Sequence, residues 1–333
     1  AYTTIDDPSA YFQTTLYTGD GANSLAITNS GNSDLQADWI WIKERNGTRD
    51  HSIFDSVRGV VKRLESNTTN AEGDETAGLL SLNSDGFTVG ADGYVNTDDN
   101  TYVAWQWKET ADAGFDIVSY TGNATGGRTI AHSLSAVPAM MIVKNRAASI
   151  KWAVYHHKNT AAPATDHLKL NADDATADDD STWNDTAPTS SVFSVGGSTS
   201  TNGDSTAYIA YLFAEKQGYS KFGSYAGNNN ANGPFIYLGF KPAWVMVKKY
   251  TATNHWIIWD NKRATKNGNN IIDKKLYANL SHAENGADDV SFLSNGFKLH
   301  TNTGDWNEAE SYIFMAFAEN PLVTSTGIPA TAE

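Results

Sequence analysis

Three segments of the chain alternate between large and small side chains with a period of two residues. In the first of them, Val103, Trp105 and Trp107 share one face, and Ala104 lies on the other. Such alternation predicts β-strands, and two largely apolar faces are typical of central strands covered on both sides. The three expected strands span residues 102–109, 208–215 and 312–319. Strands of the same kind are expected at 39–42, 140–143 and 244–247.

The same landmarks recur three times in the same order. Phe87, Phe193 and Phe297 each precede the tyrosine that opens the closing segment by the same 15 residues. The copies are 106 and 104 residues apart, which is too long for a solenoid unit but suits a self-sufficient domain. We therefore expect a lead at 1–11, three copies at 12–110, 114–216 and 219–320, and a tail at 321–333. The tail is expected to be frayed or docked on a neighbouring subunit.

The fold class follows from short strands and polar loops. No segment shows a long apolar period of 3.6 residues, and the loops are rich in Asn, Asp, Ser, Thr and Gly. Asp85-Gly86 and Asn295-Gly296 predict tight hairpin turns, whereas copy two has Ser191-Val192 there and needs another turn. We expect an all-β protein of three tandem antiparallel β-sandwich domains, of jelly-roll type. The short links predict fixed relative positions and an elongated rod.

Composition and charge argue against several classes of function. Lys and Arg total 24 against 38 Asp and Glu, a formal charge of −14, which disfavours binding to nucleic acid. The absence of cysteine excludes disulfides, zinc–thiolate sites and cysteine nucleophiles. Apolar runs are too short to span a bilayer, so no membrane insertion is expected. The first residues have neither basic residues nor an apolar core, so they predict no signal peptide.

Two charged positions recur in every copy. A lysine ends the 39–42 strand and its equivalents, and a glutamate ends each closing strand: Lys43, Lys144 and Lys248, and Glu109, Glu215 and Glu319. We interpret the glutamates as structural acceptors for backbone N–H groups and as ion-pair partners for the lysines. A glycosidase needs a second carboxylate at a defined separation, and none recurs in all copies, because His156 stands where the others have Asp55 and Asp260. No catalytic residue is assigned.

Two further sets of residues are candidates for ligand binding. Asp92, Asp98 and Asp99 could bind Ca²⁺, although their segment lacks the oxygen spacing of an EF-hand and a solvated loop is the favoured interpretation. No other cofactor is expected. Trp183 and Trp306 lie in polar loops and are the predicted exposed aromatics, suited to stacking on a sugar, with loop anchoring as the alternative.

Several segments resemble an uncharacterised repeat-domain family of virion structural and tail-fibre-like proteins from marine tailed phages. The resemblance is carried by the opening residues 1–12, by Phe54-Asp-Ser-Val-Arg-Gly59, by Gly218-Tyr-Ser-Lys-Phe-Gly-Ser-Tyr225 and by Pro242-Ala-Trp-Val-Met-Val-Lys248, and it covers nearly the whole chain. It implies a concanavalin-like or jelly-roll sandwich. It carries over no catalytic residues.

The sequence therefore predicts a non-enzymatic phage virion protein, a tail fibre, appendage or capsid decoration that adheres to the host. It would be made in the host cytoplasm and sit on the virion surface. Its expected partners are other virion proteins, further copies of itself in a trimer, and a host-surface glycan. A carbohydrate-binding module is the alternative, and a glycan hydrolase is the least supported reading.

Overall fold

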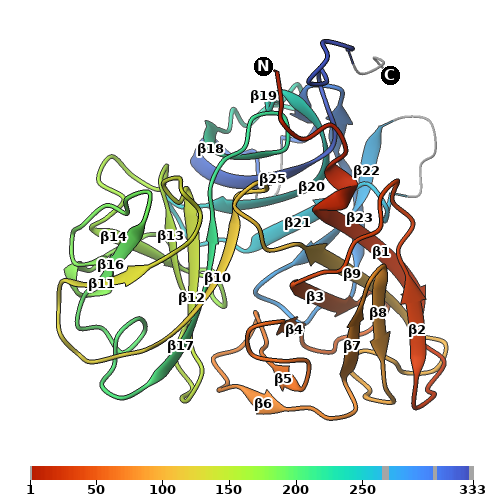
Figure 1. Cartoon of the computed structure of the whole chain (residues 1–333). Helices are drawn as coiled ribbons and strands as arrows, with labels where there is room; N and C mark the ends of the chain where they lie inside the picture. The colour runs from red at the N-terminus through yellow and green to blue at the C-terminus, as the bar shows by residue number, and fades with distance from the viewer. Residues whose placement is uncertain (1, 265–269, 303–305, 330–333) are drawn as a thin grey trace.

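The computed structural model describes residues 2–264, 270–302 and 306–329, and these are built almost entirely of β-strands (Figure 1). Strand accounts for 43% and helix for 2%, and the sheets are antiparallel, which confirms the predicted all-β class. The helices are η1 (Pro8–Ala10) and α1 (Asp180–Trp183). Neither these nor any other helix in the described part of the chain has the length and hydrophobicity that a membrane crossing needs.

Each copy contributes one large sheet, and the first four strands of all three sheets have corresponding order. Copy one has β1 (Phe12–Thr18), β9 (Thr101–Trp107), β3 (Trp39–Glu44) and β4 (Ser52–Asp55). Copy two has β10 (Phe115–Thr121), β17 (Ala207–Phe213), β12 (Met140–Asn145), β13 (Ala153–His156), β14 (Asp166–Lys169) and β15 (Ala177–Asp178). Copy three has β18 (Ser220–Ala226), β25 (Ser311–Pro321), β20 (Phe240–Lys249), β21 (Trp256–Asp260), β22 (Ile271–Tyr277), β23 (Asn285–Leu293), β24 (Gly296–Leu299) and β19 (Phe235–Tyr237). The last of these sheets nearly closes on itself.

The register of these sheets repeats as well. Tyr102, Tyr208 and Tyr312 each pair directly with a tyrosine of the first strand of their own copy, and each tyrosine pair is stacked. The predicted central strands β3, β9, β12, β17, β20 and β25 all have neighbours on both sides. The threefold recurrence read from the sequence is therefore present in strand order and register.

Smaller sheets cover the outer faces. They comprise β2 (Leu25–Thr28), β8 (Gly86–Val89) and β7 (Leu79–Asn83) in copy one, and β11 (Arg128–Ala131) with β16 (Val192–Val195) in copy two. A two-stranded ribbon, β5 (Lys62–Arg63) and β6 (Gly73–Asp74), completes the strands. The landmark residues Phe87, Phe193 and Phe297 each lie in a separate buried cluster. In copies one and two the landmark is on an outer strand, β8 or β16, and in copy three it is on β24 of the large sheet itself.

The hairpin prediction is right about place and wrong about the turn residues. Asn83 pairs with Gly86, so Ser84 and Asp85 form the turn and the glycine begins the next strand. Gly86 has a φ of 112°, and a Cβ there would lie 2.0 Å from the Ile27 carbonyl oxygen. A close backbone approach, and not only turn geometry, therefore requires glycine.

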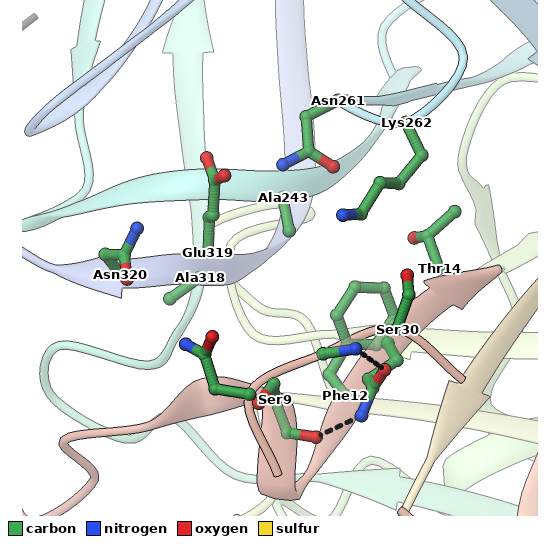
Figure 2. A pocket seen from close by; sticks show the side chains of 13 residues that line it. Ser9, Phe12, Thr14, Ser30, Ala243, Asn261, Lys262, Ala318, Glu319 and Asn320 are labelled. Carbon is green, nitrogen blue, oxygen red and sulfur yellow. Dashed lines mark hydrogen bonds between the residues drawn. The ribbon is translucent and has the colours of Figure 1, made fainter. Parts of the chain in front are cut away.

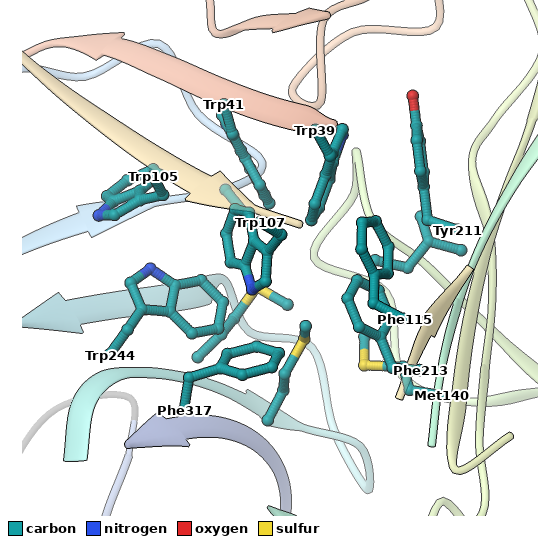
Figure 3. Close-up of a cluster of buried hydrophobic side chains, with 14 of the residues drawn as sticks. Trp39, Trp41, Trp105, Trp107, Phe115, Met140, Tyr211, Phe213, Trp244 and Phe317 are labelled. Carbon is teal, nitrogen blue, oxygen red and sulfur yellow. The ribbon is translucent and has the colours of Figure 1, made fainter. Parts of the chain in front are cut away.

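A fourth hydrophobic cluster joins the three copies at the centre of the molecule (Figure 3). The inward faces of the large sheets supply it with aromatic and methionine side chains: Trp39, Trp41, Trp105, Trp107, Phe115, Met140, Tyr211, Phe213, Trp244 and Phe317. The expected elongated rod is therefore corrected, because the copies pack around a common core. Each large sheet is buried on one face within its copy and on the other against its neighbours.

Backbone hydrogen bonds link the copies in a closed cycle. Glu72 of copy one donates its N–H to the Arg146 carbonyl of copy two at 2.9 Å. Thr176 of copy two does the same to Tyr250 of copy three, at 2.9 Å. Glu284 of copy three returns to Arg45 of copy one, at 2.7 Å. Because the third link leads back to the first copy, the arrangement is a ring with no free end.

Buried polar side chains support two junctions of the ring with similar networks. In copy one, Asp55 pairs with Arg58, and both reach the Tyr211 hydroxyl of copy two. In copy three, Asp260 pairs with Arg263 and accepts a hydrogen bond from Trp105 Nε1 of copy one at 3.0 Å.

Glutamates extend both networks across the junctions. Glu72 bridges Arg58 and Arg146, while Glu284 bridges Arg263 and Arg45. Each network therefore joins a pair of copies by charge as well as by packing.

The third junction explains the histidine of copy two. The position equivalent to Tyr211 and Trp105 is Met315 in copy three, and a thioether has no hydrogen to donate to a carboxylate. His156 uses Nε2 to reach the backbone carbonyl of Phe314 instead, at 3.1 Å. Burial lowers the pKa of His156 to about 3, so this ring is neutral and donates through Nε2. The His156 side chain therefore hydrogen-bonds copy two to copy three.

Candidate functional site

The three recurrent lysines do not pair with the recurrent glutamates. Lys144 Nζ donates to the carbonyl of Thr69 in copy one and to Ala148 and Ile150 of its own loop. Lys248 likewise reaches Asp173 of copy two, and Lys43 reaches Glu44 and Gly47 carbonyls. Burial lowers the pKa of each lysine to about 8. The predicted Lys–Glu pairs are wrong, because each lysine donates hydrogen bonds to backbone carbonyls instead.

The recurrent glutamates lie where one copy meets the first strand of the next, and we call these places seams. Glu109 accepts the Ile117 N–H of copy two at 3.0 Å, and Glu215 accepts the Phe222 N–H of copy three at 3.4 Å. These two bonds confirm the predicted role as backbone acceptors. Glu319 lies at the seam between copies three and one, where its carboxylate is 3.4 Å from Lys241 Nζ.

The seam between copies three and one opens into a cleft of about 310 Å³, which we call the third–first cleft (Figure 2). Copy one supplies Thr14 from β1 and Ser30 from the loop after β2. Copy three supplies Asn261 and Lys262 from the end of β21, together with Glu319. Polar groups from two copies therefore converge on one space.

The third–first cleft contains polar atoms whose hydrogen-bonding capacity is unused. Thr14 is only 5% exposed, and within the described residues its Oγ1 has no hydrogen-bond partner. The same holds for Asn261 Oδ1. Leaving such atoms unpaired costs about 1–3 kcal/mol each. Both atoms are almost inaccessible to solvent, so a side-chain rotation must precede contact with a ligand or water, and the cost of the unpaired state favours that rotation. By contrast, the neighbouring Gln13 amide is engaged with Ser9, Gly31 and Ser33.

A related cleft of about 540 Å³ lies at the seam between copies two and three, and we call it the second–third cleft. Glu215 lines it from copy two and Lys221 from copy three. Phe235 and Tyr237 of β19 are 44% and 54% exposed along its edge, and Lys221 Nζ lies 5.3 Å from the Tyr237 ring centre. Exposed aromatic rings beside polar groups are suited to stacking on a sugar, the role expected of Trp183 and Trp306.

The seam between copies one and two is acidic. Asp38 and Asp116 stand beside Glu109, with Asp116 at the position held by Gln13 and Lys221 at the other seams. Burial raises the pKa of Glu109 to about 7, and the neighbouring carboxylates of Asp116 and Asp38 act in the same direction. Glu109 is therefore protonated in a good share of molecules at neutral pH.

This raised pKa predicts a pH-dependent stability. The folded protein holds the Glu109 proton more tightly than the unfolded chain, so the contribution is complete below pH 4.5 and is lost as the pH rises through about 7. We expect Glu109→Gln, which stays neutral, to raise stability at pH 8–9 by roughly 1 kcal/mol after allowance for partial exposure. Thermal unfolding from pH 5 to 9 measures this difference.

Glu215→Gln is the matched control, because Lys221 occupies the position that Asp116 has beside Glu109. Its unfolding curve should not show the same gain at high pH. Parallel pH profiles for wild type and Glu109→Gln would contradict the raised pKa.

The predicted aromatic site residues are not exposed. Trp183 and Trp306 are 1% and 3% exposed, and each packs edge-on against an aromatic ring of its own copy, Tyr155 and Trp259. The expectation of exposed stacking platforms is corrected, because their indoles complete the outer hydrophobic clusters. Trp183 reaches its cluster from helix α1, which begins after the capping carboxylate of Asp179.

The predicted calcium residues point to different surroundings. Asp92 is partly buried, accepts the Tyr94 N–H and lies 3.8 Å from Arg63, while Asp98 and Asp99 are exposed. Over the residues that the structure describes, no three carboxylate or histidine side chains gather as metal ligands. Ca²⁺ binding by this segment stays a prediction.

Residues of the clefts other than the recurrent glutamates were missed from the sequence. Thr14 lies far along the chain from Asn261 and Lys262, and none of the three belongs to a motif. A usable signal existed in the glutamates, because a charged residue that recurs beside each inter-copy link marks the place where copies meet.

Comparison with known proteins identifies the family. The model for the Domain of unknown function (DUF7483) matches residues 7–321, so the chain belongs to this family. Neither the curated proteins nor the solved structures gave a match to the chain.

Proposed function

We propose that this DUF7483 protein is a non-enzymatic structural component of a phage virion that contributes to host-surface adhesion. The observation that carries the proposal is the closed ring: three copies share one core, which makes a rigid body with loops on its outside. Variable loops on a fixed scaffold are a common way to build a binding surface. The resemblance to tail-fibre-like proteins supplies the phage context.

Several finer features belong to the same proposal. Each copy is a β-sandwich of jelly-roll or concanavalin-like type with the boundaries given above. The protein is made in the host cytoplasm and sits on the virion surface as a tail fibre, appendage or capsid decoration. It contacts other virion proteins and assembles as a trimer of chains, because appendages of this kind are usually symmetric.

A carbohydrate-binding module is the second candidate function. It is favoured by the second–third cleft, where exposed Phe235 and Tyr237 stand beside Glu215 and Lys221. Aromatic faces with nearby polar groups are suited to sugars. The two candidates are compatible, since adhesion to a host can proceed through its glycans.

Purified virions test the proposal. We expect mass spectrometry to detect the chain at a fixed ratio to the capsid protein, and a virion reconstruction to place a three-lobed density of this size on the particle surface. Antibodies against the purified protein should label intact particles. If the chain is made during infection but is absent from purified particles, the virion role is wrong.

A further inference from the structure

We infer that the third–first cleft is a binding site for a neutral saccharide unit, held by Thr14, Asn261, Lys262 and Glu319. The inference deepens the proposed adhesion role by naming a ligand class. It rests on that role only for the source of the sugar.

The cleft contains polar side chains whose hydrogen-bonding capacity is unused. Thr14 lines it from copy one and Asn261 from copy three (Figure 2). Within the described residues neither Thr14 Oγ1 nor Asn261 Oδ1 has a hydrogen-bond partner. The Asn261 N–H donates to the Ala243 carbonyl at 2.9 Å, which holds the backbone of this residue beside the cleft.

The polar lining of the cleft mixes hydrogen-bond donors and acceptors. Lys262 supplies an ammonium donor, Asn261 and Glu319 supply acceptors, and the Thr14 hydroxyl can do either. A sugar hydroxyl also donates and accepts, so it can satisfy both kinds of group. A sulfate has only acceptors and a phosphate has mostly acceptors, and the negative charge of either would meet the Glu319 carboxylate, which favours a neutral polyol over an anion.

The lining of the cleft also includes apolar residues. Phe12, Ala243 and Ala318 contribute apolar surface beside the polar groups, and the two alanines have small side chains. At the seam of copies one and two the equivalent positions are Asp38 and Lys108, whose side chains are larger. A volume of about 310 Å³ is at the lower limit for ligand pockets, which suits a mono- or disaccharide unit.

Ligand-observed NMR and calorimetry on the full chain test the inference. The probes are the methyl glycosides of glucose, galactose, mannose and N-acetylglucosamine, with inorganic phosphate as the anionic probe. We expect saturable binding of at least one glycoside and none of phosphate. Asn261→Ala and Thr14→Val should each weaken that binding about tenfold, because each removes one hydrogen-bonding group.

Two further variants keep the result interpretable. Lys262→Ala changes an exposed side chain and should fold normally while weakening binding. Lys108→Ala, an exposed lysine at the first–second seam, is the matched control and should bind like wild type. Thermal unfolding of every variant identifies any that lose binding through loss of the fold.

The outcomes separate the inference from the proposed function. Failure of all four glycosides to bind, or equal binding by wild type, Asn261→Ala and Lys262→Ala, overturns the saccharide site. Binding of phosphate alone also overturns it. Glycoside binding that depends on the cleft, by a chain absent from virions, supports the site and refutes the virion role.

Discussion

Trp107→Ala is expected to destabilise all three copies together, by about 3–5 kcal/mol. The Trp107 side chain is fully buried, and its ring centre lies 4.5 Å from that of Trp39 in its own copy. The ring centres of Trp244 and Phe317 of copy three are 5.6 Å and 5.7 Å away. Trp39 in turn stacks on Tyr211 of copy two at 4.7 Å. A cavity at this position therefore removes contacts on which the whole ring depends.

The measurement is calorimetric unfolding together with hydrogen exchange of strands from each copy. We expect one cooperative transition in wild type and in Trp107→Ala, shifted to lower temperature in the variant, and faster exchange in all copies. Phe235→Ala, at an exposed aromatic residue, is the control and should unfold close to wild type. Separate transitions, with two copies unchanged, would show that the copies are independent domains and that the shared core is not cooperative.

Asp260→Ala is expected to lower the free energy of unfolding by about 3–5 kcal/mol, because it breaks a buried ion pair. The Asp260 carboxylate is fully buried with Arg263 and accepts hydrogen bonds from the N–H groups of Lys262 and Arg263 as well as from Trp105 of copy one. Within the described part of the chain, its removal leaves the buried guanidinium paired with Glu284 alone. The penalty arises mainly from the uncompensated charge.

Denaturant titration of Asp260→Ala and of the double variant Asp260→Leu/Arg263→Met measures this penalty. Replacing both charges by apolar groups should recover most of the loss, since no unpaired ion then remains. Asp74→Ala is the control, because its pair with Lys62 is exposed and such pairs contribute little. If Asp260→Ala unfolds like the control, the buried pair does not hold copies three and one together.

The strands could be predicted from the sequence because the period of two and the recurrence of landmarks are local properties. The shared core could not be predicted in this way. An apolar face on a strand shows that something covers it, but Trp105 and Trp107 look the same whether the covering layer comes from their own copy or from another. Closure of the ring is a long-range property, and the short links between copies fit a rod equally well.

The incorrect predictions about the site residues also arose because local sequence does not show which side chains meet in the fold. Lys43 and Glu109 recur together, yet β3 and β9 are antiparallel, so Lys43 pairs with Val103 while Glu109 follows the opposite end of β9. The backbone role of Glu109 and Glu215 was predicted correctly, since it depends only on the strand end. Trp183 was judged by its polar sequence neighbours, but a short helix directs its indole into the outer cluster of copy two.

Joining the three copies in a single polypeptide has freed their junctions from being identical. In a ring of three separate, identical chains every junction must use the same residues, so a substitution that suits one alters all of them. Here the carboxylate-rich junction at Glu109, the polar hollow at Asn261 and the aromatic edge at Tyr237 occupy related positions with different chemistry. A single chain can thus present three chemically different junctions on the same arrangement of sheets. A substitution at one junction leaves the residues of the other two unchanged.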